Sequence, residues 1–397
     1  MLDTIFDLGV LYLSDFGKPT DPDPPRAPLD LCACVECQLV QLRYTTAPDL
    51  MFRKYWYLSS INETMRDELA DIVQKAQELV PLEAGDVVMD IGANDGTLLA
   101  AYPGNLPLLK VAYEPAENLQ DRLKAHAGIV VPDYFPRPVH DPAADLIERR
   151  VKILTSIAMF YDLDDPKLFI REVGRMLHQD GVWIVQFQDL HQMLKATAFD
   201  NICHEHLIYY SLETFEDMIA YEGLKVVKVE LRPINGGSYR IYVRHNHHPA
   251  DESVNAARHL EAGCQDWDQL QKFAWRARMI QSQIRGVLHH LRANGKTVDV
   301  YGASTKFNTI AQCCGIGPDV VRQAWERSPA KFGLHTVTGI PIVNEIEGRL
   351  DPPDALLVGI WQFRESILRR ESRYLSNNRA MIFPLPHVEI VRDDDPD

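Results

Sequence analysis

A glycine-rich turn near residue 90 carries the residue types best suited to hold a ligand. The apolar run Val87–Ile91 predicts a buried parallel strand, and a tight turn containing Gly92 and Gly96 follows it. Glycine has no Cβ, so the backbone can bend sharply there and a ligand can approach it closely. A helix after Gly96 would direct its free N–H groups and positive dipole end toward the turn.

The spacing of the turn favours one cofactor over another. A dinucleotide site needs a G-x-G-x-x-G/A pattern, but the second glycine position is Asn94 and the sixth is Thr97. The arrangement Asp90-x-Gly92-x-Asn94-x-Gly96 instead resembles the first motif of class I S-adenosylmethionine (SAM) methyltransferases. The resemblance implies that the turn holds the amino-acid end of SAM. The alternative is a glycine turn in an unrelated α/β domain.

Two more polar residues follow predicted strands. The strand predicted at residues 108–113 is followed by Glu114, whose two carboxylate oxygens could accept hydrogen bonds from both ribose hydroxyls. The strand predicted at residues 151–156 has Ser156 as its last residue. Ligands of parallel sheets bind outside the carboxyl ends of the strands. We therefore expect these cofactor-binding residues: Asp90, Gly92, Asn94, Gly96, Glu114 and Ser156.

His204, Glu205 and His206 form a second chemical cluster. Taken alone, the pattern is typical of a polar strand edge with hydrogen-bonded histidines. On a strand, the rings of His204 and His206 would share one face and could chelate a cation. Such a site would indicate metal-assisted O-methylation.

Cys34 and Cys37 have the spacing of half a zinc knuckle. A closed structural zinc site needs four ligands, and the chain has no second C-x-x-C. Cys32 and a distant histidine could complete the site, so zinc and two free buried thiols both remain open. The seven cysteines form no even, spaced framework, which indicates reduced thiols in a cytosolic protein.

Composition limits the class of protein. The 397 residues suffice for two or three domains, and the formal charge of −15 argues against a non-specific nucleic-acid binder. No apolar run is long enough to span a membrane, and Asp3 with no basic n-region argues against a signal peptide. We expect a cytoplasmic protein that binds neither membrane nor nucleic acid.

The remaining elements place these residues in an α/β framework. Strands alternate with helices from Val87 onward, which predicts a mostly parallel sheet with right-handed crossovers. A hairpin follows, with strands at 225–229 and 239–244. A second, smaller Rossmann-like unit begins at Val298–Tyr301, where Gly302 and Lys306 could cradle a phosphate or form an ordinary strand–helix turn. Residues 1–58 are expected to be irregular.

Several motifs in one order resemble a known family, the three-domain sugar-nucleotide C-methyltransferases that act on NDP-4-keto-deoxyhexoses. The resemblance covers nearly the whole chain and rests on these segments: Cys34-x-x-Cys37-Gln38-Leu39-Val40-Gln41-Leu42, Tyr55-x-Tyr57-x-Ser59-Ser60, Asp90–Gly96, His204-Glu205-His206, Gly236-Gly237-Ser238-x-Arg240, Gly302–Lys306 and Phe383–Pro386. It implies a zinc-binding domain at 1–58, a SAM domain at 59–246 and a Rossmann-like sugar-nucleotide domain at 247–397.

The chain departs from the family pattern in three places. The family's zinc site uses two cysteine pairs, and this sequence starts after the point where the first pair would lie. The family often has Tyr where Cys203 stands, and His where Asn235 stands. These departures concern zinc, the substrate and the enolate, and leave the SAM turn unchanged.

The resemblance assigns roles to the polar residues. Methylating the carbon beside a keto group requires a base, a partner for the enolate oxygen and alignment with the SAM sulfonium. His206 is the expected base, Glu205 orients an imidazole or binds a hydroxyl, and His204, Tyr57 or Asn235 donates to the enolate. The expected substrate contacts are Tyr55, Gly237, Ser238, Arg240, Ser304 and Lys306. Arg240 could contact phosphate or only brace the hairpin.

Two alternatives remain at this point. One is O-methylation of a sugar or natural-product hydroxyl, and the other is a non-catalytic protein that binds SAM or a sugar nucleotide. The expected partner is a small-molecule sugar nucleotide, and the expected state is a monomer or homodimer.

Overall fold

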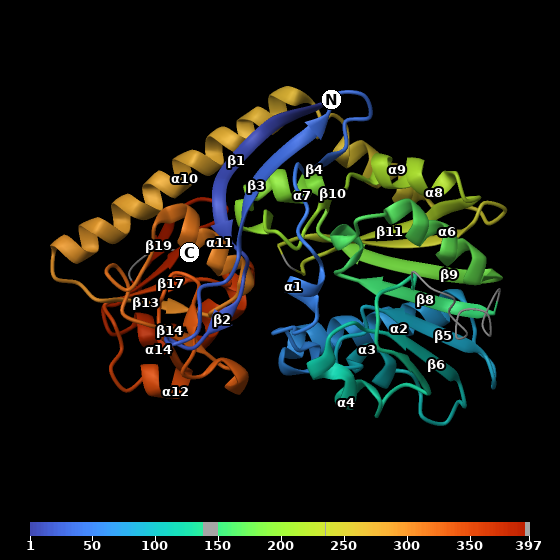
Figure 1. The fold of residues 1–397 in the computed structure, drawn as a ribbon, viewed down its shortest axis with the longest axis horizontal. Coiled ribbons are helices and arrows are strands. Elements are labelled where there is room, and N and C mark those ends of the chain that lie inside the picture. Colours follow the sequence, from blue (N-terminus) through green and yellow to red (C-terminus); the bar gives the residue numbers. More distant parts are fainter. Residues whose placement is uncertain (138–149, 235, 394–397) are drawn as a thin grey trace. The chain divides into compact units, whose positions relative to one another are not determined.

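The computed structural model describes residues 1–137, 150–234 and 236–393. The chain divides into two compact units (Figure 1). The first unit joins residues 1–46, 190–206 and 263–397, and the second joins 47–189 and 207–262. The three consecutive domains expected from the sequence stay a prediction.

The second unit is built on a seven-stranded sheet in the order β11-β12-β9-β8-β5-β6-β7. β5 to β9 are parallel, β12 runs antiparallel to β9, and β11 runs antiparallel to β12, which confirms the predicted hairpin. The strands are β5 (Val87–Ile91), β6 (Leu109–Tyr113), β7 (Ile129–Val131), β8 (Val151–Ile157), β9 (Leu177–Phe187), β11 (Leu224–Arg232) and β12 (Ser238–His245).

Apolar side chains cover both faces of this sheet, as expected for parallel strands. Helix α2 (Glu63–Leu79) packs Leu69, Ile72 and Val73 against the strands. A separate cluster of aromatic rings forms around Phe160 and Trp183. The other elements of the unit are α1 (Asp49–Phe52), α3 (Thr97–Ala100), α4 (Gln120–Leu123), α6 (Pro166–Met176), β10 (Ile208–Tyr209), α8 (Leu212–Ala220) and α9 (Glu252–Glu261).

The first unit contains the smaller Rossmann-like sheet predicted from the sequence. Its order is β16-β14-β13-β17-β18-β19, and all neighbours are parallel except β18 and β19. The strands are β13 (Val298–Tyr301), β14 (Ala324–Glu326), β16 (Ile342–Asn344), β17 (Ala355–Val358), β18 (Ala380–Phe383) and β19 (Glu389–Val391). The helices are α7 (Leu190–Lys195), α10 (Trp267–Ala293), α11 (Thr305–Cys314), α12 (Glu345–Gly348), α13 (Arg364–Arg370) and α14 (Ser372–Leu375).

The N-terminal segment is not irregular, which corrects the sequence-based expectation. β1 (Leu2–Tyr12) pairs antiparallel with β3 (Arg26–Cys34), which pairs with β4 (Val40–Leu42), and β2 (Phe16–Gly17) pairs with β15 (His335–Thr336). The register between β1 and β3 shifts twice. Each shift breaks the alternation of apolar and polar residues, so the strand pattern is hidden in the sequence.

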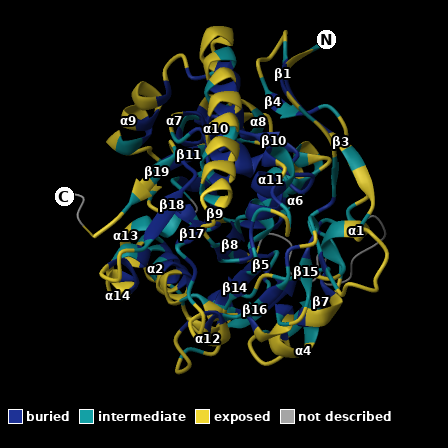
Figure 2. Ribbon diagram, turned by 90° about the vertical axis from the view of Figure 1, so that its left-hand side faces the viewer, coloured by how far each residue is buried: buried dark blue, intermediate teal, exposed yellow. Residues whose placement is uncertain are grey.

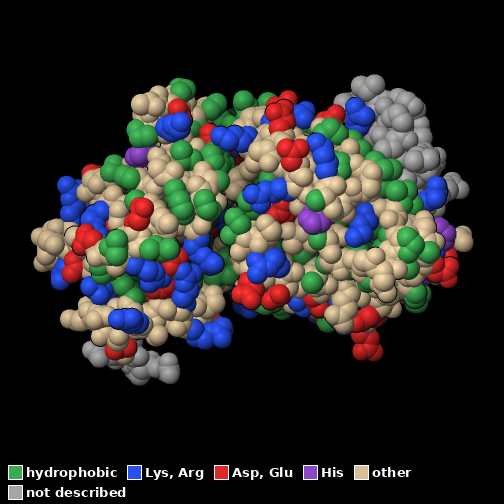
Figure 3. Space-filling model, turned by 90° about the horizontal axis from the view of Figure 1, so that it is seen from below, with side chains coloured by type: hydrophobic (Ala, Val, Ile, Leu, Met, Phe, Trp, Pro, Cys, Tyr) green, Lys and Arg blue, Asp and Glu red, His purple; other side chains and the backbone are tan. Residues whose placement is uncertain are grey.

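Helix α10 lies along β1, where the rings of Phe6 and Phe273 meet edge to face at 6.3 Å (Figure 1). Its buried stripe includes Phe273, Ala277 and Ile284, and Figure 2 shows its opposite face exposed. Figure 3 shows Lys and Arg side chains interspersed with Asp and Glu on the face in view, so the net negative charge is not one continuous patch there.

In the described part of the chain, we find no helix with the length and apolar character needed to cross a membrane.

Arg240 is a structural residue, which corrects its expected role as a substrate contact. Its side chain is fully buried, and its guanidinium donates to Glu68 and Asp71 of α2 at 2.7 Å each. It also donates to the amide oxygen of Gln186 at 3.0 Å. The sequence left bracing of the hairpin open, and these contacts favour it, because no face of the guanidinium is exposed to a ligand.

We expect Arg240→Met to lower the free energy of unfolding by about 1.5–3 kcal/mol, because Glu68 and Asp71 lose charge-assisted hydrogen bonds in a buried site, although Arg232 still pairs with both. Denaturant unfolding measures this change. The matched control is Arg364→Met, whose partner Glu389 is a third exposed, and it should cost about 1 kcal/mol or less. If the Arg240→Met variant is as stable as the parent protein and only its KM for the sugar substrate is higher, Arg240 contacts the substrate after all.

Candidate active site

The turn after β5 adopts the conformation that its sequence predicts. Gly92, Asn94 and Gly96 have φ values of 70°, 51° and 83°, in the left-handed region that glycine and asparagine tolerate best. A Cβ on Gly92 would lie 3.0 Å from Cγ of Met159. The following helix α3 spans only Thr97–Ala100, so its dipole is smaller than the sequence suggested.

Glu114 joins this turn to the end of β6. One of its carboxylate oxygens accepts the N–H of Asn94 at 2.7 Å, and the other accepts the N–H of Ala116 at 2.8 Å. Burial raises the pKa of Glu114, although these two N–H groups oppose the shift. The structure therefore brings Glu114 and the glycine turn together, as predicted for a SAM site.

Asp90 lies beneath the turn and is almost fully buried. Its carboxylate accepts a hydrogen bond from the Thr155 hydroxyl at 2.6 Å. Burial, with a smaller contribution from Glu114, raises the pKa of Asp90 to about 7, although the Thr155 hydroxyl opposes the shift. The base of the turn therefore holds two carboxyl groups whose ionisation responds to a nearby positive charge.

Ser156 does not fit its expected role as a cofactor contact. Its side chain is fully buried, and its hydroxyl oxygen accepts the indole N–H of Trp183 at 2.8 Å. Its position at the carboxyl end of a strand placed Ser156 among the expected cofactor contacts, but its hydroxyl is turned toward Trp183 in the aromatic core.

The aromatic segment 55–60, here called the strap, is tied directly to the turn. The side chain of Asn94 donates to the carbonyl of Tyr57 at 3.1 Å and accepts the N–H of Ser59 at 3.0 Å. The carboxylate of Asp95 accepts the N–H of Ser60 at 3.0 Å. Asn94 and Asp95 thus fix Tyr57, which is 42% exposed, beside the predicted SAM site.

Tyr55 is held by a second anchor, because the side-chain amide of Asn118 exchanges two hydrogen bonds with its backbone at 2.9 and 3.0 Å. Sequence reasoning missed Asp95 and Asn118 as anchors of the strap. Asp95-x-Thr97 carries a local signal, since the Asp95 carboxylate also accepts from the Thr97 hydroxyl at 2.6 Å. Asn118 has no such signal.

The histidine cluster belongs to the first unit and lies in turns, not on a strand. Nε2 of His204 lies 3.0 Å from the carbonyl of Ala27, whereas Nδ1 of His206 lies 2.8 Å from the carbonyl of Asn201. The two rings use different carbonyl partners and do not share a strand face, which removes the geometric basis for the chelate considered above.

The hydrogen bond of His206 also determines its tautomer. A carbonyl oxygen only accepts, so Nδ1 carries the proton and Nε2 presents a lone pair. Burial and the nearby Lys306 ammonium lower the pKa of His206 to about 3, against a small opposite effect of the Asn201 carbonyl. His206 is therefore a neutral imidazole at physiological pH.

Lys306 lies close enough to the histidine cluster to act on it electrostatically. Burial lowers the pKa of Lys306, while Asp200 and Cys203 oppose that shift. Asp200 in turn accepts the indole N–H of Trp361 at 2.8 Å. Burial also raises the pKa of Glu205. The structure thus gathers His206, Glu205 and Lys306, which the sequence assigned to two separate motifs.

Two family models match the chain in sequence. A "Methyltransferase domain" model matches residues 61–229, and a "C-methyltransferase C-terminal domain" model matches residues 233–386. The C-methyltransferase NovU of Streptomyces niveus is 28% identical over 370 residues, which are 92% of this chain and 87% of that protein.

The chain is a SAM-dependent methyltransferase, and its residues 233–386 resemble the C-terminal domain of C-methyltransferases. This confirms the resemblance drawn from the sequence motifs, the class I SAM methyltransferase fold and SAM as cofactor. The two matched regions together run from residue 61 to 386 with a short gap, so they cover the seven-stranded sheet apart from the end of β11, and the smaller sheet apart from β19.

Two solved structures match part of the chain at low sequence identity and low TM-score. A SAM-dependent methyltransferase from Mesorhizobium loti is 12% identical, with 45% of this chain and 100% of that chain covered and a TM-score of 0.36. A second, from Clostridium acetobutylicum, is 10% identical, with 45% and 92% covered and a TM-score of 0.35.

Other expected substrate contacts are engaged in local structure. The Ser304 hydroxyl caps α11 by accepting the N–H of Phe307 at 3.0 Å, and it lies 3.1 Å from the carbonyl of Gly359. Ser238 is buried and its hydroxyl donates to the carbonyl of Ile234. Gly237 has a φ of 107°, which suits the hairpin turn, and Asn235 lies outside the described residues.

The cysteines present do not fit a closed four-ligand zinc site. The pKa of Cys34 is lowered by hydrogen bonds from the backbone of Cys37 and Glu36 and from the Cys37 thiol, which favours a thiolate. Cys32, however, is buried, and its thiol donates to the carbonyl of Gln41 at 3.3 Å. Among the described residues, no third cysteine, histidine or carboxylate ligand joins Cys34 and Cys37.

We expect SAM to bind about three- to tenfold more tightly at pH 8 than at pH 6, because its cationic groups favour ionised Asp90 and its pKa of about 7 lies between these values. Isothermal titration calorimetry in two buffers would show proton release on binding.

The matched variants are Asp90→Asn, which should lose the pH dependence, and Glu117→Gln at an exposed position after β6, which should keep it. Identical SAM affinity of the unmodified protein at both pH values would contradict a titrating Asp90.

Proposed function

We propose that this methyltransferase transfers a methyl group from SAM to the carbon beside the keto group of an NDP-4-keto-deoxysugar, with His206 as the base. The single observation that carries the proposal is the orientation of His206, whose Nδ1 donates to the Asn201 carbonyl at 2.8 Å, which places the ring proton on Nδ1 and makes Nε2 the basic nitrogen. Supporting it are the relative named as a C-methyltransferase and the C-terminal family model.

The chemistry requires an enolate. Nε2 of His206 takes the proton from the carbon next to the carbonyl, the electron pair moves to the carbonyl oxygen, and the carbon then attacks the SAM methyl group. Sulfur leaves with its electron pair as S-adenosylhomocysteine. The phenol of Tyr57, the ring of His204 and Asn235 remain the candidate donors to the enolate oxygen.

The low pKa of His206 gives the substrate a part in catalysis. A base with a pKa of about 3 accepts a proton from carbon poorly, and the Lys306 charge is one cause of that low value. A diphosphate bound beside Lys306 would offset its charge and raise the basicity of the imidazole. Binding of the proposed substrate would therefore raise the pKa of His206, the base that acts on it, whereas an uncharged substrate would leave that pKa unchanged.

Two other functions make different predictions. O-methylation of a sugar or natural-product hydroxyl needs no enolate, and a non-catalytic SAM or sugar-nucleotide binder needs no base. Activity lost with EDTA and restored by Mg²⁺ or Zn²⁺ at the histidine cluster would favour metal-assisted O-methylation.

We expect the protein to exchange deuterium from D₂O into the carbon beside the keto group of an NDP-4-keto-6-deoxyhexose, measured by NMR with S-adenosylhomocysteine present. His206→Ala should slow this exchange by about 10²- to 10⁴-fold, because it removes the base. His289→Ala, an exposed histidine on α10, is the control and should exchange normally. Methylation without any exchange would support a hydroxyl acceptor instead.

The pH dependence offers an independent check on Lys306. With SAM saturating, kcat/KM for the sugar substrate reports the enzyme–SAM complex before that substrate binds, so a His206 pKa of about 3 predicts no loss of activity from His206 as the pH falls from 8 to 5. Lys306→Met removes a charge that lowers this pKa, so the acidic limb should move to higher pH, while burial, the larger cause, still holds the pKa of His206 below the ordinary histidine value of about 6.5. An unchanged profile in the variant would show that Lys306 does not tune the base.

A further inference from the structure

A bend in β9 brings imidazole and carboxylate groups together in the second unit. Leu177 pairs with Val151 and Val182 pairs with Ile153, so residues 178–181 bulge out of the sheet opposite a single residue of β8. Asp180 projects from this bulge. The end of β12 lies beside it and continues through His245 into His247 and His248.

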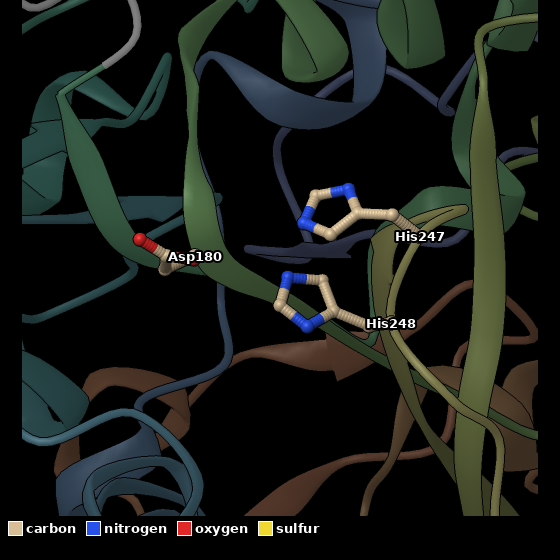
Figure 4. Close-up of side chains that lie close together, drawn as sticks. All are labelled: Asp180, His247 and His248. Atoms are coloured by element: carbon tan, nitrogen blue, oxygen red, sulfur yellow. The ribbon is translucent and has the colours of Figure 1, made fainter.

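Three of these side chains meet. One ligand atom from each of Asp180, His247 and His248 lies within 4.8 Å of the other two. The rings of His247 and His248 lie 4.1 Å apart, and Figure 4 shows them side by side, with Asp180 on the neighbouring bend. Among the described residues, this is the one place where three such ligands converge.

The surrounding contacts hold this arrangement before any ion binds. Arg244 donates to the backbone carbonyls of Asp180 and Gly181 at 2.7 and 3.1 Å, which fastens the bulge to β12. Nε2 of His248 lies 3.0 Å from the carbonyl of Gln179. An ion would take the other ring nitrogen of His248 or replace this one exposed hydrogen bond. Arg244 contacts backbone oxygens here, and the Asp180 carboxylate, whose Oδ2 lies 3.8 Å from Nδ1 of His178, can offset the positive charge of a bound ion.

The ligand types select the class of ion. Imidazole nitrogen with one carboxylate suits late first-row divalent ions such as Zn²⁺, Ni²⁺ and Co²⁺, whereas Mg²⁺ and Ca²⁺ prefer oxygen alone. At neutral pH an imidazole is mostly uncharged and presents a lone pair. Three protein ligands leave room for water, and the exposure of Asp180 and His247 gives the ion an entry path.

We propose that Asp180, His247 and His248 form a binding site for a divalent transition-metal ion, with Zn²⁺ as the expected occupant. The site lies where β9 begins, at the amino edge of the parallel strands. Gly92 and Glu114 follow the carboxyl ends of β5 and β6, at the opposite edge of the same sheet. The ion therefore stabilises the bulge and takes no part in methyl transfer, and this inference does not depend on the proposed substrate.

The test is a Co²⁺ titration of the full-length, metal-stripped protein carrying Cys34→Ser and Cys37→Ser, followed by optical absorption and by Zn²⁺ competition. One Co²⁺ should bind per chain, with weak ligand-field bands and no thiolate charge-transfer band. His247→Ala with His248→Ala should weaken binding by at least about 30-fold, and Asp180→Asn, which keeps the side-chain shape, by about fivefold or more.

The matched control is His289→Ala with His290→Ala, an adjacent pair of exposed histidines on α10, which should bind Co²⁺ like the parent. Zn²⁺ should also raise the thermal unfolding midpoint of the parent and of this control, but not of the His247 and His248 variant. Equal Co²⁺ affinity in both histidine-pair variants, or no binding by the parent below millimolar Co²⁺, would overturn the proposal.

Discussion

The hydrogen bond from the Asn94 backbone to Glu114 organises the cofactor half of the molecule. Through it, the end of β6 fixes a turn in which Asn94 itself has a φ of 51°. The same residue then uses both ends of its side-chain amide to hold the strap at Tyr57 and Ser59. One asparagine thus couples the acceptor expected for ribose to the aromatic segment expected near the substrate, and neither could shift without straining the other.

The parts of the fold with short-range signals could be predicted from the sequence. The buried strand Val87–Ile91, its left-handed turn and Glu114 follow from apolar runs and glycine spacing, and both Rossmann-like sheets follow from the alternation of strand and helix. Long-range partners carry no such signal. Arg240 looked like an anion ligand, because nothing in its neighbourhood in the sequence reveals Glu68 and Asp71, which lie some 170 residues away.

Electrostatics explains why the histidine cluster was only partly predictable. The motif identified His206, but its tautomer depends on the Asn201 carbonyl, and its low pKa depends on burial and on Lys306, a hundred residues later in the chain. Ser156 and Ser304 show the opposite outcome, because both were predicted to contact a ligand, but Ser156 is buried and Ser304 caps a helix. Position at a strand's end predicts that a side chain is near a ligand edge, but packing decides whether it faces the ligand.

The pairing of β1 with β3 has a consequence for how the protein is made. These strands belong to the unit completed by residues 263–397, and Phe6 needs Phe273 to bury its ring. On the ribosome, the first strands to emerge must wait for nearly the last part of the chain, while residues 47–262 already contain every strand of the seven-stranded sheet. A prematurely terminated product would leave the apolar side of β1 uncovered and prone to aggregate.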